Sequence, residues 1–173
     1  MGAAKLLTAA GGAITLDAAS TATDKTITIP ARTGNLAVDG PAFSAYNSGT
    51  QTVSTATNTK LVCNTESFDT ASCFDSTTNY RFTPNVAGYY QVNVSGYGYP
   101  SATGIVGIKL YKNGSEYFKT EVANSNQGPL VSGSSLVYLN GSTDYIEIYA
   151  YQNSGGNLTM SATDFSASMV RAA

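Results

Sequence analysis

Apolar and polar residues alternate over most of residues 41–173, with turn-forming residues between the alternating stretches. A period of two places successive side chains on opposite faces of a strand, and helical periodicity is nearly absent. Short strands at this spacing predict an all-β sandwich or jelly roll. The pattern is clearest in Gly88–Tyr99, Gly104–Tyr111, Ser134–Leu139, Asp144–Tyr151 and Asp164–Val170.

Two Asn-Gly dipeptides mark candidate hairpin turns. Asn113-Gly114 separates the apolar run ending at Tyr111 from the one that begins at Tyr117. Asn140-Gly141 repeats this arrangement between Ser134–Leu139 and Asp144–Tyr151. Because both residue types tolerate positive φ, Asn-Gly favours a two-residue hairpin turn, and we expect one at each position.

The stretch Asp144–Tyr151 has two contrasting faces. Ile146, Ile148 and Ala150 form one face, which we expect to be core. The other face carries the candidate trimer-interface residues Tyr145, Glu147, Tyr149 and Tyr151. Tyrosine gives a large amphipathic contact area, which favours a partner on this face. The alternative is that these tyrosines lie across their own sheet.

The first 40 residues differ in composition from the rest and are rich in Ala, Thr and Gly. They contain short extended pieces at Ala13–Asp17, Thr26–Pro30 and Gly34–Gly40. So small a unit cannot bury enough surface alone. We therefore expect two parts, an N-terminal virion-anchoring segment (1–40) and a jelly-roll trimerisation or head domain (41–173). The candidate anchoring residues are Ile14, Leu16, Ile27, Ile29 and Leu36.

Charge narrows the choice of partners. Only 12% of the residues are charged, the net charge is −2, and no basic patch is visible, which argues against nucleic-acid binding. No apolar run reaches the roughly 18 residues of a membrane span. Nothing resembles a signal peptide, so we expect synthesis in a host bacterial cytoplasm and release by lysis.

The chain has no histidine, which excludes His-based triads and His metal ligands. Cys63 and Cys73 lack a Cys-x-x-Cys spacing. We favour one buried thiol and one thiol in a loop, and a disulfide between the two residues stays open as the alternative. Glu66, Asp69 and Asp75 lie close enough in sequence to suggest paired glycosidase carboxylates, but Asp and Ser also cap turns, and we favour the turn. The sequence predicts no enzyme, cofactor or metal site.

Residues 41–173 resemble the globular-head domain of complement, a jelly roll related to tumour necrosis factor. The resemblance implies a ten-strand jelly roll that assembles as a homotrimer, with Tyr149 and Tyr151 toward the three-fold axis. The chain has no collagen-like Gly-x-y stalk, so the vertebrate role is not implied, and we see no acidic cluster suited to the calcium site of some members. The matching segments are Pro41–Tyr46, Tyr80–Pro84, Gly88–Tyr90, Leu110–Gly114, Ser142–Ile146 and Phe165–Val170.

The first 40 residues resemble a segment found in bacteriophage tail-fibre and other virion proteins, just before a distal domain. This resemblance is carried by Gly12–Leu16, Ala22–Pro30 and Thr33–Ala37. Together the two resemblances imply a phage virion protein on the particle exterior.

Three functions compete. A capsid decoration or cement protein, bound to the major capsid protein, is favoured because no shaft or coiled coil is present to project a fibre tip. The alternative is the receptor-binding tip of a short tail fibre, contacting tail proteins and a host surface receptor through the loops near Ser67–Thr78 and Asn124–Gly128. A depolymerase that uses Glu66 or Asp69 is the third and least favoured.

Overall fold

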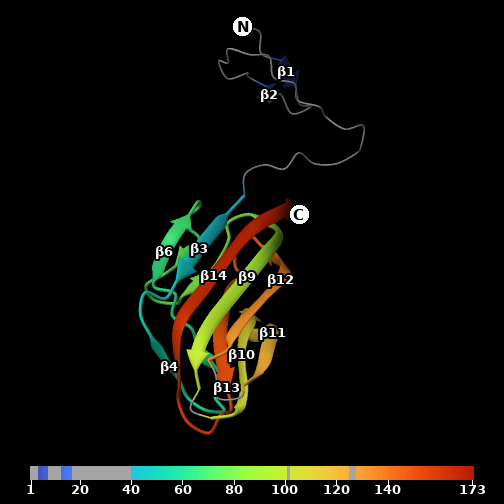
Figure 1. The fold of residues 1–173 in the computed structure, drawn as a ribbon. Coiled ribbons are helices and arrows are strands. Elements are labelled where there is room, and N and C mark those ends of the chain that lie inside the picture. The colour runs from blue at the N-terminus through green and yellow to red at the C-terminus, as the bar shows by residue number, and fades with distance from the viewer. Residues whose placement is uncertain (1–3, 8–12, 17–39, 101, 125–127) are drawn as a thin grey trace, which may run out of the picture. The chain divides into compact units, whose positions relative to one another are not determined.

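The computed structural model describes residues 4–7, 13–16, 40–100, 102–124 and 128–173. The chain separates into two compact units, Met1–Asn35 and Leu36–Ala173. Every regular element in the described ranges is a β-strand (Figure 1). No helix in these ranges is long and apolar enough to cross a membrane.

In the first unit, β1 (Ala4–Leu7) pairs antiparallel with β2 (Ala13–Leu16). The register places Leu6 opposite Ile14 and Ala4 opposite Leu16. The strand expected from Ala13 onward is therefore confirmed. The extended piece expected at Thr26–Pro30 lies outside the described residues, and so does the piece expected at Gly34–Gly40 except for Gly40 itself.

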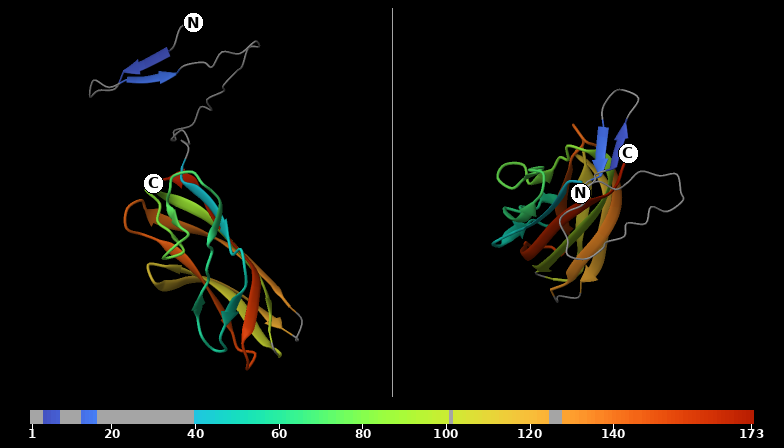
Figure 2. Two further views of the ribbon diagram at one scale, coloured as in Figure 1. Left: turned by 90° about the vertical axis from the view of Figure 1, so that its left-hand side faces the viewer. Right: turned by 90° about the horizontal axis from the view of Figure 1, so that it is seen from above.

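The second unit is an antiparallel jelly-roll sandwich of two sheets (Figures 1 and 2). The first sheet has the order β12 (Leu130–Asn140), β9 (Ala87–Tyr99), β14 (Leu158–Ala172), β3 (Ala42–Tyr46) and β6 (Thr65–Asp69), with β4 (Gln51–Val53) also paired to β14. The second has the order β11 (Ser115–Asn124), β10 (Gly104–Lys112), β13 (Ile146–Gln152), β8 (Arg81–Phe82) and β7 (Phe74–Asp75), with β5 (Thr59–Lys60) paired to β13.

This architecture confirms the all-β prediction. The five strands read from alternation correspond to β9, β10, β12, β13 and β14. The resemblance implies ten strands, and the described part of this unit has twelve because β4, β5, β7 and β8 are pieces of two or three residues.

The core lies between the inward faces of the two sheets. Phe43 is at its centre, with ring centroids 4.5 Å from Phe74, 4.6 Å from Phe82 and 4.9 Å from Phe165. The predicted inward face of β13 is confirmed, because Ile146, Ile148 and Ala150 are buried. Aromatic contacts of this kind stabilise a core beyond the area that they bury.

The hairpin predicted at Asn113-Gly114 is confirmed. Asn113 has φ 52° and Gly114 has φ 78°, the two positive values that a type I′ turn requires, and β10 pairs with β11 across it.

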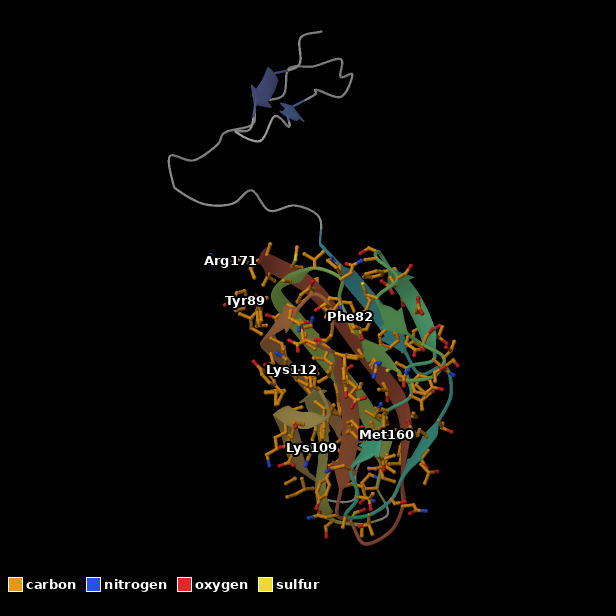
Figure 3. All side chains as sticks on the ribbon, turned by 180° about the vertical axis from the view of Figure 1, so that it is seen from behind. Phe82, Tyr89, Lys109, Lys112, Met160 and Arg171 are labelled. Atoms are coloured by element: carbon orange, nitrogen blue, oxygen red, sulfur yellow. The ribbon has the colours of Figure 1, made fainter. Side chains whose placement is uncertain are left out.

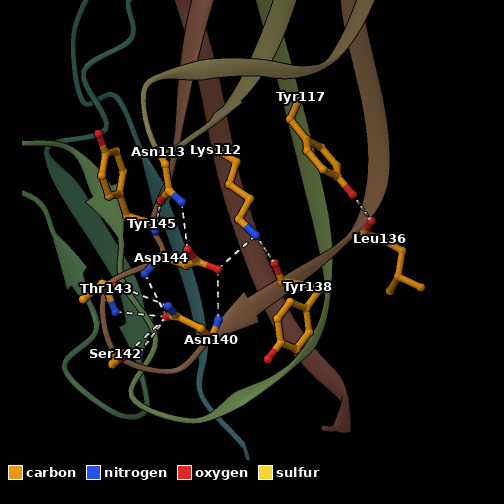
Figure 4. A network of polar contacts seen from close by, with 10 residues as sticks. All are labelled: Lys112, Asn113, Tyr117, Leu136, Tyr138, Asn140, Ser142, Thr143, Asp144 and Tyr145. Atoms are coloured by element: carbon orange, nitrogen blue, oxygen red, sulfur yellow. Dashed lines mark hydrogen bonds and ion pairs between the residues drawn. The ribbon is translucent and has the colours of Figure 1, made fainter.

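The hairpin expected at Asn140-Gly141 was wrong. β12 and β13 belong to different sheets, so the segment between them crosses the sandwich. Only Gly141 has positive φ, 71°. The Asn140 side-chain oxygen accepts the backbone N–H groups of Ser142, Thr143 and Asp144, which turns the chain away from β12 (Figure 4).

Candidate interaction surfaces

The outward face of the first sheet carries uncovered apolar side chains at one end. Tyr89, Leu136, Tyr138 and Val170 are 41%, 51%, 41% and 53% exposed. They come from three neighbouring strands, β9, β12 and β14, and Tyr138 lies directly opposite Tyr89 with ring centroids 5.5 Å apart. We call these four residues the apolar patch. Contiguous exposed apolar surface of this kind marks interaction sites.

A bulge in β14 helps to create the apolar patch. Met169 lies opposite Tyr90 and Arg171 opposite Tyr89, so Val170 is the extra residue. The extra residue of a bulge changes the direction in which the neighbouring side chains point. Figure 3 shows Tyr89 and Arg171 at the same end of the domain.

Polar contacts from the second sheet hold β12 in place behind the patch (Figure 4). Lys112 donates to the Tyr138 carbonyl at 2.8 Å and pairs with the Asp144 carboxylate at 2.9 Å. Asn113 Nδ2 donates to the same carboxylate at 2.8 Å, which with the Lys112 ammonium lowers the pKa of Asp144. The network fixes the backbone that presents Tyr138.

β12 is an edge strand whose backbone acceptors are engaged by β11 side chains. The Tyr117 hydroxyl donates to the Leu136 carbonyl at 3.1 Å, and Thr120 Oγ1 donates to the Ser132 carbonyl at 3.0 Å. Native proteins protect edge strands because free backbone groups invite another strand. Two carbonyls of the β12 edge are therefore already bound by side chains of the same chain.

A second exposed aromatic pair lies at the opposite edge of the first sheet. Phe68 on β6 is 51% exposed and Tyr46 on β3 is 39% exposed. Phe68 lies opposite Ser44, two residues from Tyr46 on the outward face of β3. We call Tyr46 and Phe68 the edge patch.

The tyrosine face predicted as the trimer interface lies on the outward side of β13 in the second sheet, with Tyr145 just before the strand, and packs in part against its own chain. The Arg81 guanidinium lies 4.4 Å from the Tyr145 ring centroid, and the Lys109 ammonium 4.9 Å from that of Tyr151. The Tyr149 ring lies 4.4 Å from the Tyr111 ring. The three predicted tyrosines are half-buried among these neighbours. The prediction that this face forms a trimer interface stays a prediction.

Glu147 is the least accessible residue of that face, at 4% exposed. Its carboxylate forms an ion pair with Lys60 and accepts a hydrogen bond from the Tyr149 hydroxyl at 3.2 Å. Burial, then the neighbouring Glu147 charge and its hydrogen bond, raise the pKa of Tyr149 to about 12. Tyr149 therefore stays neutral and serves as a donor.

Asp69, the last residue of β6, and Asp75, the last residue of β7, accept hydrogen bonds from backbone groups that follow them in the chain. Asp69 accepts the N–H groups of Ala71 at 3.1 Å and Phe74 at 2.7 Å. Asp75 accepts those of Thr77, Thr78 and Asn79 at 2.9–3.0 Å, and these bonds hold its carboxyl pKa well below the usual range. This is the turn-capping arrangement that the sequence favours.

Cys63 and Cys73 are free thiols, and both are buried. Burial, reinforced by the Asp164 charge, raises the pKa of Cys63 to about 12.

Within the part of the chain that the structure describes, no group of three or more His, Cys, Asp or Glu residues could hold a metal ion. Of the candidate anchoring residues, Ile14 and Leu16 lie in β2, while Ile27, Ile29 and Leu36 lie outside the described residues.

Comparisons with known proteins show the fold. No family model and no curated protein matches the chain. Among solved structures, the globular domain of zebrafish complement 1qA protein is 18% identical with a TM-score of 0.55, covering 77% of this chain and 99% of that one. PRD1 vertex protein P5 is 16% identical with a TM-score of 0.59, covering 78% and 99%. The likeness to the complement domain confirms the fold expected from the resemblance.

Proposed function

We propose that this chain is a non-enzymatic structural protein of a bacteriophage particle, which assembles as a homotrimer and decorates the capsid exterior. The observation that carries the proposal is the uncovered apolar patch on an otherwise complete jelly roll. A domain with a filled core that still exposes Leu136 and Val170 at half their area has a surface suited to another protein. The shared fold with PRD1 vertex protein P5 supports a virion role.

The apolar patch is our proposed contact between copies. It lies on the first sheet, whereas the tyrosine face around Tyr149 lies on the second. On the tyrosine face, the Arg81 and Lys109 cations lie beside tyrosine rings, and the Glu147 carboxylate forms an ion pair with Lys60 of the same chain. It therefore offers a partner less free apolar surface than the patch does, although the prediction that it forms the interface stays a prediction.

The N-terminal segment is the proposed attachment to the major capsid protein. β1 and β2 form a two-stranded ribbon, and an isolated ribbon of this length is marginally stable in water. Strand addition to the shell would supply main-chain hydrogen bonds and bury Ile14, Leu16 and the other candidate anchoring residues, Ile27, Ile29 and Leu36.

The copy number of the chain in purified particles tests the capsid assignment. Quantitative mass spectrometry should find hundreds of copies, in fixed proportion to the major capsid protein. A handful of copies per particle, co-purifying with tail proteins, would contradict decoration.

A receptor-binding tail tip is the second candidate, favoured by one observation. Tyr99 and Leu130 are 58% and 66% exposed, and Tyr99 pairs with the start of β14, while Pro41 contacts its end. The exposed pair therefore lies at the end of the domain remote from the point where the chain enters it. Purified protein that adsorbs to host cells, and loses adsorption with Tyr99→Ala, would favour this function.

A further inference from the structure

The end of the jelly roll remote from Pro41 is built from uncharged segments. β9 and β13 end here, and β10 and β14 begin here (Figure 1). The segments 51–59, 97–107, 128–132 and 151–160, which we call the distal end, contain no Asp, Glu, Lys or Arg. The four ion pairs of the described residues all lie outside these segments. The chemistry of the distal end therefore rests on amides, hydroxyls and apolar side chains.

A buried glutamine holds the loops of the distal end in one arrangement. Gln152 Nε2 donates to the carbonyls of Val53 at 3.1 Å and Gly156 at 2.7 Å, and Oε1 accepts the Ser154 backbone N–H at 2.8 Å. The Gln152 carbonyl accepts the N–H of Ala56, whose φ is 54°. A left-handed conformation at a residue with a Cβ persists only where its surroundings enforce it. These loops are thus ordered in advance, which lowers the entropic cost of binding a ligand.

Two tyrosines form the centre of an exposed surface at this end. Tyr99 is 58% exposed, and its ring meets that of Tyr97 edge-on with centroids 4.8 Å apart. Thr159 on β14 lies directly opposite Tyr99, and Leu130 on β12 lies directly opposite Tyr97. Residues directly opposite each other on paired strands share a face of the sheet. We call Tyr97, Tyr99, Leu130 and Thr159 the distal platform.

Polar side chains without a partner border the distal platform. Asn157 and Thr159 are exposed, and neither side chain makes a hydrogen bond to the described part of the chain. They are two residues apart, which is about 7 Å along an extended chain. An amide and a hydroxyl can each both donate and accept hydrogen bonds. Tyr99 therefore has uncharged donors and acceptors beside it.

We propose that the distal platform binds a neutral glycan, with a sugar ring lying on Tyr99 and its hydroxyl groups bonded to Asn157 and Thr159. A pyranose has an apolar face of C–H groups that packs on an aromatic ring, and a rim of hydroxyls that donate and accept. An acidic glycan would find no cation at the distal end to pair with its carboxylates. This inference rests on the receptor-binding candidate above, whose ligand class it names.

A glycan array probed with the full chain tests the ligand class. The array carries neutral oligosaccharides of glucose, galactose, mannose and N-acetylglucosamine, beside counterparts that bear glucuronate or phosphate. Binding to at least one neutral oligosaccharide is expected, and its affinity should change by less than about twofold as salt is raised, because no charge pair is screened. Failure to bind every neutral member, or binding to acidic members alone, would overturn the proposal.

Variants measured by calorimetry with the bound oligosaccharide test the residues. Tyr99→Ala should raise Kd about tenfold, whereas Tyr99→Phe, which keeps the ring, should stay within about threefold of the unchanged chain. Asn157→Ala should raise Kd about fivefold through the lost hydrogen bond. Tyr46→Ala, at an exposed tyrosine of the edge patch, is the matched control and should bind normally. Equal affinity of the Tyr99→Ala variant and the control would overturn the site.

Adsorption of the full chain to host cells separates this inference from the function on which it rests. Adsorption that is lost in Tyr99→Ala, together with no binding to any neutral glycan, overturns the glycan and leaves the receptor-binding candidate. Neither adsorption nor glycan binding overturns both. A Tyr99→Ala variant with an altered native mass, in a chain that binds no glycan, would assign the platform to contacts between copies and overturn the glycan site.

Discussion

Phe43 shows how a single residue holds the two sheets together. It projects from β3 of the first sheet and stacks on Phe74 and Phe82 of the second, while Phe165 of its own sheet packs edge-on. Residues from β7 and β8, which are only two residues long, are thus positioned by core contacts more than by their short ladders. The core explains why such short strands persist.

Phe43→Ala should lower the free energy of unfolding by about 3–5 kcal/mol, because it removes buried area and leaves a cavity among three rings. Urea denaturation followed by tyrosine fluorescence measures the loss. Leu130→Ala, at a position that is 66% exposed, is the control and should change stability by less than about 0.5 kcal/mol. A similar small loss in both variants would contradict the central role of Phe43.

Asp75 makes the stability of its loop depend on pH. Its pKa is lowered in the folded chain because backbone N–H groups of Thr78 and Thr77 bind the carboxylate. A lowered folded pKa means that the stabilisation is present above the ordinary carboxyl pKa of 3.8 and is lost as the pH falls through the folded pKa.

The midpoint of thermal unfolding should therefore fall as the pH drops below 3.8, and Asp75→Asn should fall less over the same range. Melts monitored by circular dichroism at a series of pH values give both curves. Parallel curves for the two proteins would show that Asp75 does not contribute, and that other carboxyls such as Asp144, whose pKa is also lowered, dominate.

At the scale of elements, the tyrosine face of β13 and the apolar patch are the two candidate interfaces, and opposite results are expected when each is mutated. Tyr149→Ala removes the contact with Tyr111 and the hydrogen bond to Glu147, so it should lower the free energy of unfolding by about 2 kcal/mol. It should leave the oligomeric state unchanged. Leu136→Asp should instead preserve the fold and dissociate the assembly, because it places an unpaired carboxylate in an apolar contact.

Sedimentation velocity and circular dichroism on the two variants distinguish the faces. If Tyr149→Ala yields folded monomers while Leu136→Asp stays assembled, then the tyrosine face of β13 is the interface.

The sequence predicted strands well where one face is buried and the other polar. In β13 the alternation of Ile146, Ile148 and Ala150 with tyrosines identified the inward side. In β12 it could not identify the patch, because Leu136 and Tyr138 point outward and Val137 and Leu139 inward. Four consecutive apolar residues do not reveal which face is uncovered.

Other features depend on contacts that a local pattern does not contain. The bulge that exposes Val170 arises from the pairing of β14 with β9. The Asn140-Gly141 turn carries a hairpin dipeptide, but the Asn140 side chain caps the following N–H groups and directs the chain to the other sheet. Strands of two residues, such as β5, are too short to show a periodic pattern in the sequence.

At the scale of the whole molecule, the fold of a single chain leaves exposed apolar side chains at the apolar patch, at the edge patch and at Tyr99 and Leu130. The two inward sheet faces are buried, two carbonyls of the β12 edge accept hydrogen bonds from β11 side chains, and Arg81 and Lys109 lie beside tyrosine rings of the second sheet. The apolar patch has no such cover within the described residues. With only 12% charged residues, the chain also has little charge to oppose close packing of identical copies.

The native mass of the full chain in solution tests the proposed assembly most directly. Light scattering coupled to size exclusion should give three chains of 17.9 kDa each at micromolar concentration. The value should persist at high salt, because an apolar contact is not screened. A stable monomer under these conditions would contradict the homotrimer on which the account rests.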